Sequence, residues 1–316
     1  MENIKIIKFG GTSLATPRLQ NNVVKIIRNN PAKYVIICSA MGRLGFPYST
    51  ESLMNLVDKL SLSNKEYDRL IGCGEIISSI RLSSVLNQNN IKTYALSYIE
   101  SGINCDNSYS GGNIINLKDN ISDKLNTYQV IIVPGFIGKS NEEEIITLGR
   151  GNSDLSAILI ADILKEKEVI LYKDVDGVYH TSPQVYKKLK KYSNISYNEM
   201  ILLNEIGFNV VSKDALIYAK EKEITIKIKH YNEENEGTII SNISSNEKLL
   251  GFNISDKYVD FVCYDQKVVN LFKNRLNENH IFIEEELISE FIYRFHINKS
   301  IQSIIKKILF DMIWFF

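Results

Sequence analysis

The sequence contains few of the residues that mark specialised classes of protein. Its four cysteines form no pair with the spacing of a metal site or a redox motif: Cys38, Cys73, Cys105 and Cys263. A chain of 316 residues can bury enough apolar surface to fold without disulfide staples. Five prolines and 23% charged residues also argue against a disordered chain. We therefore expect a folded cytoplasmic protein with reduced thiols.

The sequence also lacks net charge and long apolar runs. Lys and Arg together number 37, and so do Asp and Glu, so no overall field attracts the protein to nucleic acid or anionic lipid. The N-terminal stretch carries charges and no cleavage site of the kind found in signal peptides. The apolar run at residues 304–316 is shorter than the ~20 residues that span a bilayer. We expect neither a nucleic-acid partner nor a membrane partner.

What the sequence does contain is an alternation of two hydrophobic patterns. Short runs rich in Ile, Val and Tyr alternate with stretches that place an apolar residue at every third or fourth position, which indicates βαβ units. Apolar runs such as residues 34–38 and 130–134 are typical of a sheet covered on both faces. We predict an α/β fold with a mainly parallel sheet, in which residues 114–126 form one of the helices.

The length and one polar stretch suggest two domains. Residues 241–248, SNISSNEK, lack periodicity and precede a new strand-like start, so we place the boundary near Ser245. Residues 1–245 form the first predicted domain and residues 246–316 the second. The second contains strand patterns, including one at residues 281–284, and two helix patterns. It resembles a small α+β module of the ACT-like kind that binds amino-acid effectors.

The first motif with chemical meaning is KFGGTS, residues 8–13, where an apolar strand ends and a helix begins. Glycines at such a turn let backbone N–H groups approach an anion, and a helix N-terminus adds a favourable dipole. A phosphate site is one interpretation. An ordinary strand-to-helix turn with a surface lysine is the other, because the motif is neither a Walker sequence nor GxGxxG.

The second motif is PGFIGKSNEEEIITLGRGNSDLSA, residues 134–157, which contains two glycine turns. Arg150 and Asp154 flank the start of a predicted helix, where Arg150 can clamp a carboxylate and Asp154 can orient a lysine. Alternatively, Ser153 or Asp154 only caps the helix.

The third motif is YKDVDGVYHTSP, residues 172–183. Its aspartates, glycine and tyrosine could hold a ribose and an adenine ring, but DVDG is also an ordinary turn.

Together and in this order, the three motifs resemble the aspartate kinases of the amino-acid kinase family, over roughly residues 4–240. Further matching segments are SAMGRLGFPYSTESL (39–53), CGEIISS (73–79), ISYNEM (195–200) and EGTII (236–240). The spacing from SAMGR to PYST is similar to that of aspartate kinases from spore-forming Gram-positive bacteria. The resemblance implies a three-layer αβα fold followed by an ACT-like module.

The resemblance also implies a reaction. ATP, with Mg²⁺ carried mostly by its oxygens and by water, phosphorylates the side-chain carboxylate of L-aspartate to give an acyl phosphate. This is the first step toward lysine and diaminopimelate, threonine and methionine. The carboxylate is ionised at neutral pH, since its reference pKa is ~3.9, so no general base is needed. A homodimer is expected, because the regulatory modules of such enzymes pair between subunits.

Site residues follow from the same resemblance. Lys8 contacts the transferring phosphoryl group and Asp154 holds Lys8 in place. The expected ATP-binding residues are Lys8, Phe9, Gly10, Gly11, Ser13, Lys173, Asp174, Tyr179 and Gln184. The expected substrate-binding residues are Ser39, Thr50, Glu75, Arg150 and Ser153. No metal-ligating residue is predicted.

The chain departs from the family pattern mainly on the nucleotide side. Lys173 stands where Thr is usual, while Gln184 and Asn209 stand where cations are usual, and Asp214 is also atypical. These changes and the shortened tail leave one alternative open, a catalytically weak homologue that acts as a regulatory or binding subunit. A kinase for another carboxylate or for carbamate is a further alternative, although Glu75 with Arg150 favours a zwitterionic substrate that has a second carboxylate. The residues after Ser245 provide material for one ACT-like module, where two in tandem are common in the family.

Overall fold

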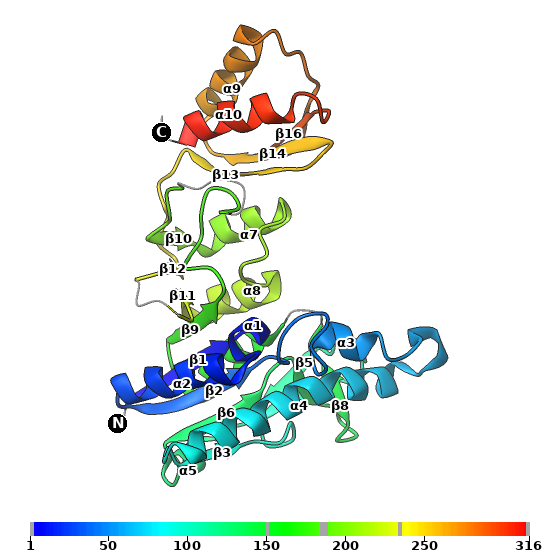
Figure 1. Cartoon of the computed structure of the whole chain (residues 1–316), viewed down its shortest axis with the longest axis vertical. Coiled ribbons are helices and arrows are strands. Elements are labelled where there is room, and N and C mark those ends of the chain that lie inside the picture. Colours follow the sequence, from blue (N-terminus) through cyan, green and yellow to red (C-terminus); the bar gives the residue numbers. More distant parts are fainter. Residues whose placement is uncertain (1–2, 150–151, 184–188, 233–235, 314–316) are drawn as a thin grey trace. The chain divides into compact units, whose positions relative to one another are not determined.

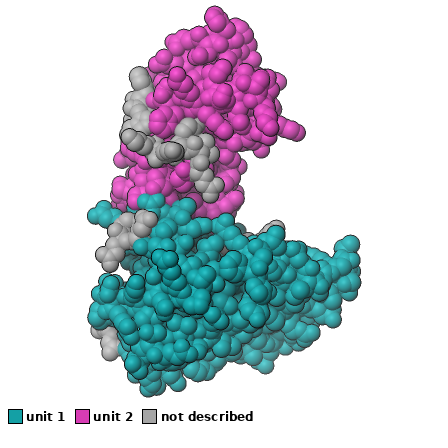
Figure 2. Space-filling model, in the orientation of Figure 1, with its two compact units in different colours: residues 1–176, 214–237 teal, residues 177–213, 238–316 magenta. Residues whose placement is uncertain are grey.

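The computed structural model describes residues 3–149, 152–183, 189–232 and 236–313 (Figure 1). The chain divides into two compact units, which are coloured separately in Figure 2. Unit 1 contains Met1–Asp176 and Asp214–Gly237, and unit 2 contains Gly177–Lys213 and Thr238–Phe316. Within the described ranges, no helix is both long enough and apolar enough to cross a bilayer.

Unit 1 is built on a sheet whose neighbouring strands all run parallel. Two inner strands of this sheet, β2 (Lys33–Cys38) and β6 (Val130–Pro134), are almost entirely buried, as their apolar runs predict. In spatial order the described strands of this sheet in unit 1 are β11 (Thr225–His230), β9 (Glu168–Lys173), β1 (Ile4–Phe9), β2 (Lys33–Cys38), β6 (Val130–Pro134) and β3 (Thr93–Ala95).

Helices cover both faces of this sheet. Phe9 of β1 joins an apolar cluster that contains side chains of two helices, α2 and α4. The neighbouring Lys8 points to the opposite face, where it reaches Asp154 at the start of α6. The three-layer αβα fold with a mainly parallel sheet is therefore confirmed. The covering helices are α2 (Pro17–Asn29), α4 (Asn64–Gln88) and α6 (Ser153–Leu164).

Local sequence signals specify where these helices begin. The Thr16 hydroxyl accepts the Leu19 N–H, and Pro17 occupies the first turn of α2, where a missing N–H has no consequence. Ser63 and Glu66 form a reciprocal capping box at the start of α4. The helix that positions Glu75 therefore has a fixed first turn.

Residues 114–126 do not form the predicted helix. Ile114–Leu117 is a strand, β5, and helical structure is confined to the short α5 (Ser122–Leu125). The Asp119 carboxylate accepts the N–H groups of Ile121 at 2.9 Å and Ser122 at 3.0 Å, which starts a new turn instead of continuing a helix. The prediction was wrong because a short apolar run fits both the helical and the extended period.

A second, smaller sheet of unit 1 is tied to α4 by a buried carboxylate. Asp68 accepts the backbone N–H groups of Ser110 and Thr147, each over 2.9 Å. The position of α4 along this sheet is thereby fixed. In spatial order the strands are β5, β4 (Ile103–Cys105), β7 (Ile137–Lys139) and β8 (Ile145–Thr147).

The remaining elements of unit 1 are short or lie at its end in the sequence. They are α1 (Gly11–Leu14), α3 (Thr50–Met54), the 3₁₀ turn η1 (Lys59–Ser61) and α8 (Lys213–Lys222), whose first residue counts with unit 2.

Unit 2 begins with a parallel strand pair and a helix: β10 (Asn194–Ser196), α7 (Tyr197–Glu205) and β12 (Thr238–Ser241). Glu199 of α7 accepts the N–H and hydroxyl of Ser245, so the residues after β12 are held against α7. The predicted domain boundary near Ser245 falls in this connection. A separate domain at residues 246–316 stays a prediction, since unit 2 joins these residues to residues 177–213.

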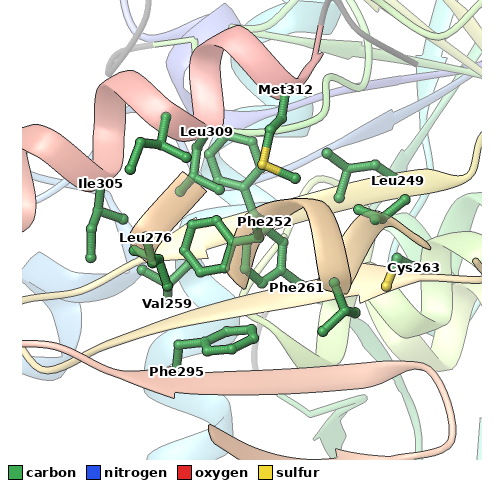
Figure 3. Close-up of a cluster of buried hydrophobic side chains, with 14 of the residues drawn as sticks. Leu249, Phe252, Val259, Phe261, Cys263, Leu276, Phe295, Ile305, Leu309 and Met312 are labelled. Carbon is green, nitrogen blue, oxygen red and sulfur yellow. The ribbon is translucent and has the colours of Figure 1, made fainter. Parts of the chain in front are cut away.

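The C-terminal part of unit 2 is a four-stranded antiparallel sheet with two helices. Its core is aromatic: the rings of Phe261, Phe272 and Phe295 meet edge to face, with centroids 4.7 to 5.5 Å apart. Figure 3 shows Phe261 and Phe295 among the buried side chains of this core. The small α+β character expected here is confirmed. The elements are β13 (Leu249–Ile254), β14 (Tyr258–Cys263), α9 (Gln266–Glu278), β15 (Glu285–Ser289), β16 (Ile292–His296) and α10 (Gln302–Ile313).

The strand expected at residues 281–284 lies a few residues later, at β15. The N–H of Ile281 donates to the carbonyl of Leu276 over 2.9 Å, so this residue closes the C-terminal end of α9 and does not start a strand. Strand pairing with β16 starts only at Glu285.

Candidate active site

Two lysines and one aspartate meet at the carboxyl edge of the parallel sheet in unit 1. The Lys8 ammonium, on β1, donates to Oδ1 of Asp154 over 2.8 Å. The Lys173 ammonium, from the last residue of β9, donates to Oδ2 of the same carboxylate over 2.6 Å. Asp154 is in the first turn of α6 and is 3% exposed, and Lys8 is 4% exposed. One buried carboxylate therefore holds two cations.

Burial and the charges of neighbouring groups shift the pKa values in this cluster in opposite directions. Burial alone would raise the pKa of Asp154, but the ammonium groups of Lys173 and Lys8 outweigh it and lower the pKa to about 2. Burial lowers the pKa of Lys173 to about 8, although the Asp154 carboxylate acts against this shift. With both ammonium groups protonated, the cluster has one net positive charge, which suits an anion such as a phosphate.

The first turn of α6 shows whether Ser153 and Asp154 cap the helix or contact other groups. The N-cap is Asn152, and its side chain makes no capping hydrogen bond. The Asn152 amide instead donates to the Leu148 carbonyl over 2.6 Å and to Asp214 over 2.9 Å. Asp154 and Ser153 are therefore free of a capping role, and the carboxylate of Asp154 serves the two lysines. Asn152 has φ of −87°, so this position does not require glycine.

The glycine turn after β1 leaves no room for a side chain at Gly11. A Cβ there would lie 2.2 Å from the carbonyl oxygen of Ala40. The Gly42 N–H donates to the Gly11 carbonyl over 2.9 Å, which holds the turn against the loop after β2. Ser13 is 1% exposed, and its hydroxyl has no hydrogen-bond partner among the described residues. A buried hydroxyl in this state indicates a place for a ligand or an ordered water.

A cavity of about 220 Å³ lies beside this turn and is lined in part by Gly11. Pockets for drug-sized ligands have volumes of roughly 300–1,000 Å³, so this cavity suits a smaller molecule. Its wall includes the hydroxyls of Ser39 and Ser153, which are 2.8 Å apart and hydrogen bonded. Thr50, the first residue of α3, and Glu75 of α4 complete a polar lining. The structure thus brings together the described substrate-binding residues that the sequence predicted.

Glu75 is the most unusual group in this wall. It is 2% exposed, and its Oε2 atom has no hydrogen-bond partner in the described part of the chain. Burial raises its pKa well above the ordinary value, although the charge of Lys8 and the N–H of Ala40 act in the other direction. A buried carboxylate with an unpaired oxygen is unfavourable by itself. It is suited to receive a cationic group such as an ammonium.

The predicted nucleotide side is brought together only in part. Phe9 stacks on Tyr172, with ring centroids 4.8 Å apart, and lies in the core on the α2 face, away from Lys8. Gly10 donates its N–H to the Tyr172 carbonyl over 3.3 Å, so that amide is already used by β9. Tyr179 belongs to unit 2, where it forms a bridge with Lys191. Arg150 and Gln184 lie outside the described residues.

Asp174 has a partner that sequence reasoning missed. The Arg43 guanidinium lies 2.6 Å from its Oδ2 atom, and both side chains are largely exposed. Arg43 is the last residue of the SAMGR segment, so that motif was the available signal. Met54 and Phe136 of the cavity wall were also missed, because their apolar character marks them only as core residues.

Comparison with known proteins gives the following matches. The sequence profile described as "Amino acid kinase family" matches residues 3–230. Aspartokinase 1 of Bacillus subtilis is 29% identical over 273 residues, which is 84% of this chain and 67% of that protein. An aspartokinase of Bacillus sp. strain MGA3 is 33% identical over 239 residues, or 74% of this chain and 57% of that protein.

The fold also has a close counterpart among solved structures. The crystal structure of E. coli aspartokinase III in complex with aspartate and ADP superposes with a TM-score of 0.69 at 19% identity, covering 94% of this chain and 79% of that one. The likeness at this identity concerns the fold. The present chain spans about 57% to 67% of the length of the two Bacillus relatives.

Proposed function

Because the chain belongs to the amino acid kinase family, we propose that it transfers the γ-phosphate of ATP to the side-chain carboxylate of L-aspartate. The product is aspartyl phosphate, the first intermediate toward lysine and diaminopimelate, threonine and methionine. The similarity to proteins named aspartokinase supports this substrate. The complex of E. coli aspartokinase III with aspartate and ADP supports the pair of ligands.

The observation that carries the proposal is the position of the Lys8 and Asp154 pair. It lies at the edge of the sheet next to the glycine turn, and a small cavity with the unpaired carboxylate of Glu75 lies beside the same turn. A cation cluster next to a carboxylate that can bind an ammonium fits a phosphoryl donor beside an amino acid.

Phosphoryl transfer to a carboxylate needs alignment and charge compensation more than acid–base chemistry. A carboxylate oxygen of the substrate attacks the γ-phosphorus, the bond from phosphorus to the bridging oxygen of ADP breaks, and no proton moves at neutral pH. Lys8 would compensate the charge on the transferring group, and Asp154 would hold Lys8 in position.

On the substrate side, Glu75 would bind the ammonium group of aspartate. Ser39, Thr50 and Ser153 would donate hydrogen bonds inside the cavity, and Arg150 is proposed to clamp a carboxylate.

On the nucleotide side, the turn containing Gly10, Gly11 and Ser13 would line the phosphates, with Phe9 contributing through its backbone. Lys173, Asp174, Tyr179 and Gln184 are proposed ATP contacts. Mg²⁺ is proposed to arrive with ATP, because this ion usually keeps waters and binds phosphate oxygens.

Three broader expectations stay proposals. We propose a homodimer, a cytoplasmic location, and a catalytic domain at residues 1–245 followed by an ACT-like module at residues 246–316. Size measurement in solution by light scattering tests the first of these.

The test of the function is turnover by purified protein with ATP, Mg²⁺ and a panel of L-aspartate, L-glutamate and carbamate. Trapping the product with hydroxylamine detects an acyl phosphate, and Lys8→Ala is the control. We expect a hydroxamate with aspartate that disappears in the variant. A preference for glutamate or carbamate would assign a different substrate. Binding of aspartate without any turnover would support a regulatory subunit instead.

A further inference from the structure

We infer that Lys173 is a second phosphate-binding cation, which Asp154 positions together with Lys8. The inference rests on the proposed function, since it concerns how the same site holds its nucleotide. It goes further by assigning Asp154 two lysines where the family resemblance implies one.

The two lysines reach Asp154 from adjacent strands that end at the same edge of the sheet. Strands β1 and β9 are parallel, and Phe9 pairs with Tyr172 in their register. Lys8 precedes this pair and Lys173 follows it, so both lie on the face opposite the Phe9 and Tyr172 rings. Each ammonium uses a different oxygen of Asp154, at 2.8 and 2.6 Å. Asp154 therefore fixes the position of both ammonium groups at once.

Asp154 alone does not balance the charge of the two ammonium groups that it contacts. Asp154 is 3% exposed, and the Lys8 and Lys173 side chains are 5% and 15% exposed. Burying two ammonium groups with one carboxylate is unfavourable unless a further anion completes the site. The adjacent buried Ser13 hydroxyl, without a partner among the described residues, is an additional donor for such an anion.

Lys173 is one of the positions at which this chain departs from the family pattern. A threonine is usual there in the family it resembles, and Gln184 and Asn209 replace residues that are usually cations. Lys213 is another basic residue of this region of the sequence, but its ammonium contacts Glu205 at 3.3 Å within unit 2. Of Lys173 and Lys213, Lys173 is therefore the one that contacts Asp154, and it restores a positive charge to the nucleotide side.

The inference predicts that a proton is coupled to nucleotide binding. The groups that face Lys173 are Asp154 from α6, Lys8 from β1 and Asp174 next in the chain, and His230 is its register partner on β11. Burial brings the pKa of Lys173 to about 8. A bound phosphate favours the charged lysine and raises this pKa, so nucleotide affinity falls as the pH increases through about 8.

The test compares Mg²⁺·ADP affinity of the full chain by titration calorimetry at several pH values above 7, where the phosphate has completed its own titration near ~6. The variants are Lys173→Thr, Lys173→Met and Lys173→Arg. We expect Thr and Met to weaken ADP binding by about 10-fold or more at pH 7, as for loss of a charged hydrogen bond. In the Lys173→Thr and Lys173→Met variants, the decline of ADP affinity above pH 8 should disappear. The Lys173→Arg variant should bind ADP at pH 7 like the wild type, and its affinity should not decline near pH 8.

Lys227→Met is the matched control, because Lys227 of β11 pairs with Glu168, which lies at the opposite end of β9 from Lys173. It should bind ADP like the wild type. Aspartate affinity should stay unchanged in all variants that remain folded by circular dichroism. Unchanged ADP affinity in Lys173→Met, or no ADP binding by the wild type, would overturn the inference.

Failure of this inference and failure of the proposed function are distinguishable. ADP binding that depends on Lys173 without aspartate turnover would contradict only the function. Turnover with aspartate and ADP affinity independent of Lys173 would contradict only the inference.

Discussion

The two units each contain a buried aspartate with a cationic partner, but the charges are arranged differently. In unit 2, Asp260 of β14 is 3% exposed and pairs with Arg294 of β16 through two hydrogen bonds of 2.7 and 2.9 Å. One guanidinium balances one carboxylate, and Arg294 also lies 4.0 Å from the ring centroid of Tyr258. In unit 1, Asp154 holds two ammonium groups.

In the Asp260 pair the two opposite charges balance each other, whereas the Asp154 carboxylate is outnumbered by the ammonium groups that it contacts and is suited to an additional anionic ligand. The Asp260 pair joins neighbouring strands and has no charge left over. The Lys8, Lys173 and Asp154 side chains, counted by themselves, have one net positive charge, and they lie next to a glycine turn and a cavity. We therefore expect changes at Asp260 to affect stability and changes around Asp154 to affect activity.

The largest expected effect is that of Asp154→Asn. Losing the carboxylate leaves two buried ammonium groups unpaired, which should destabilise the fold by about 3–5 kcal/mol. Turnover per folded molecule should fall by roughly 100–1,000-fold, as when one preorganised charge contact is lost. Urea denaturation and the hydroxamate assay measure the two effects separately. Full activity in a folded variant would remove Asp154 from the catalytic centre.

Asp154 should also give a pH dependence of stability. Its pKa of about 2 lies below the reference value of ~3.9, so its stabilising effect is present above pH ~4. This effect is lost as the pH falls toward 2. The free energy of unfolding, measured by denaturation, should fall more steeply over this pH range in the wild type than in Asp154→Asn. Equal pH dependence in the two proteins would contradict the pairing of Asp154 with the lysines.

The next effect is expected for Glu75→Gln. Removing the charge should weaken aspartate binding by about 10–100-fold, the range for a hydrogen bond to a charged group. The same change should stabilise the protein without ligand at neutral pH. Since burial raises the pKa of Glu75, its favourable protonated form is lost as the pH rises through that value. As the pH is raised from 5 to 8, the melting temperature should fall less in Glu75→Gln than in the wild type. Identical melting temperatures of the two proteins at each pH would show that Glu75 is not a buried charge.

The smallest expected effect is that of Asp260→Asn. It should reduce stability by about 1–3 kcal/mol, because the Arg294 side chain is 29% exposed and can regain water. Aspartate turnover per folded molecule should stay that of the wild type. A loss of turnover similar to that of Asp154→Asn would remove the distinction between the two aspartates.

Much of the arrangement around Lys8 and Asp154 could be predicted from the sequence because the signals are local. The run of β1 ending in two glycines predicted both a strand and a phosphate turn, with Lys8 at their junction. The second glycine motif predicted Asp154 at the start of a helix. The family resemblance then predicted its contact with Lys8, which lies 146 positions away in the sequence.

What could not be predicted depends on how separate elements meet. The contact of Lys173 with Asp154 requires the lateral position of β9 next to β1, which no pattern in the sequence encodes. The pairing of Arg43 with Asp174 joins loops 131 positions apart. Residues 114–126 were assigned to a helix because periodicity cannot show that Asp119 starts a new turn.

Phosphorus NMR with L-aspartate that carries heavy oxygen in its β-carboxylate tests the proposed phosphoryl transfer most directly. The account predicts an acyl phosphate whose bridging oxygen carries the label, formed together with ADP and depending on Lys8 and Asp154. Formation of ADP and inorganic phosphate at a rate independent of aspartate would contradict it.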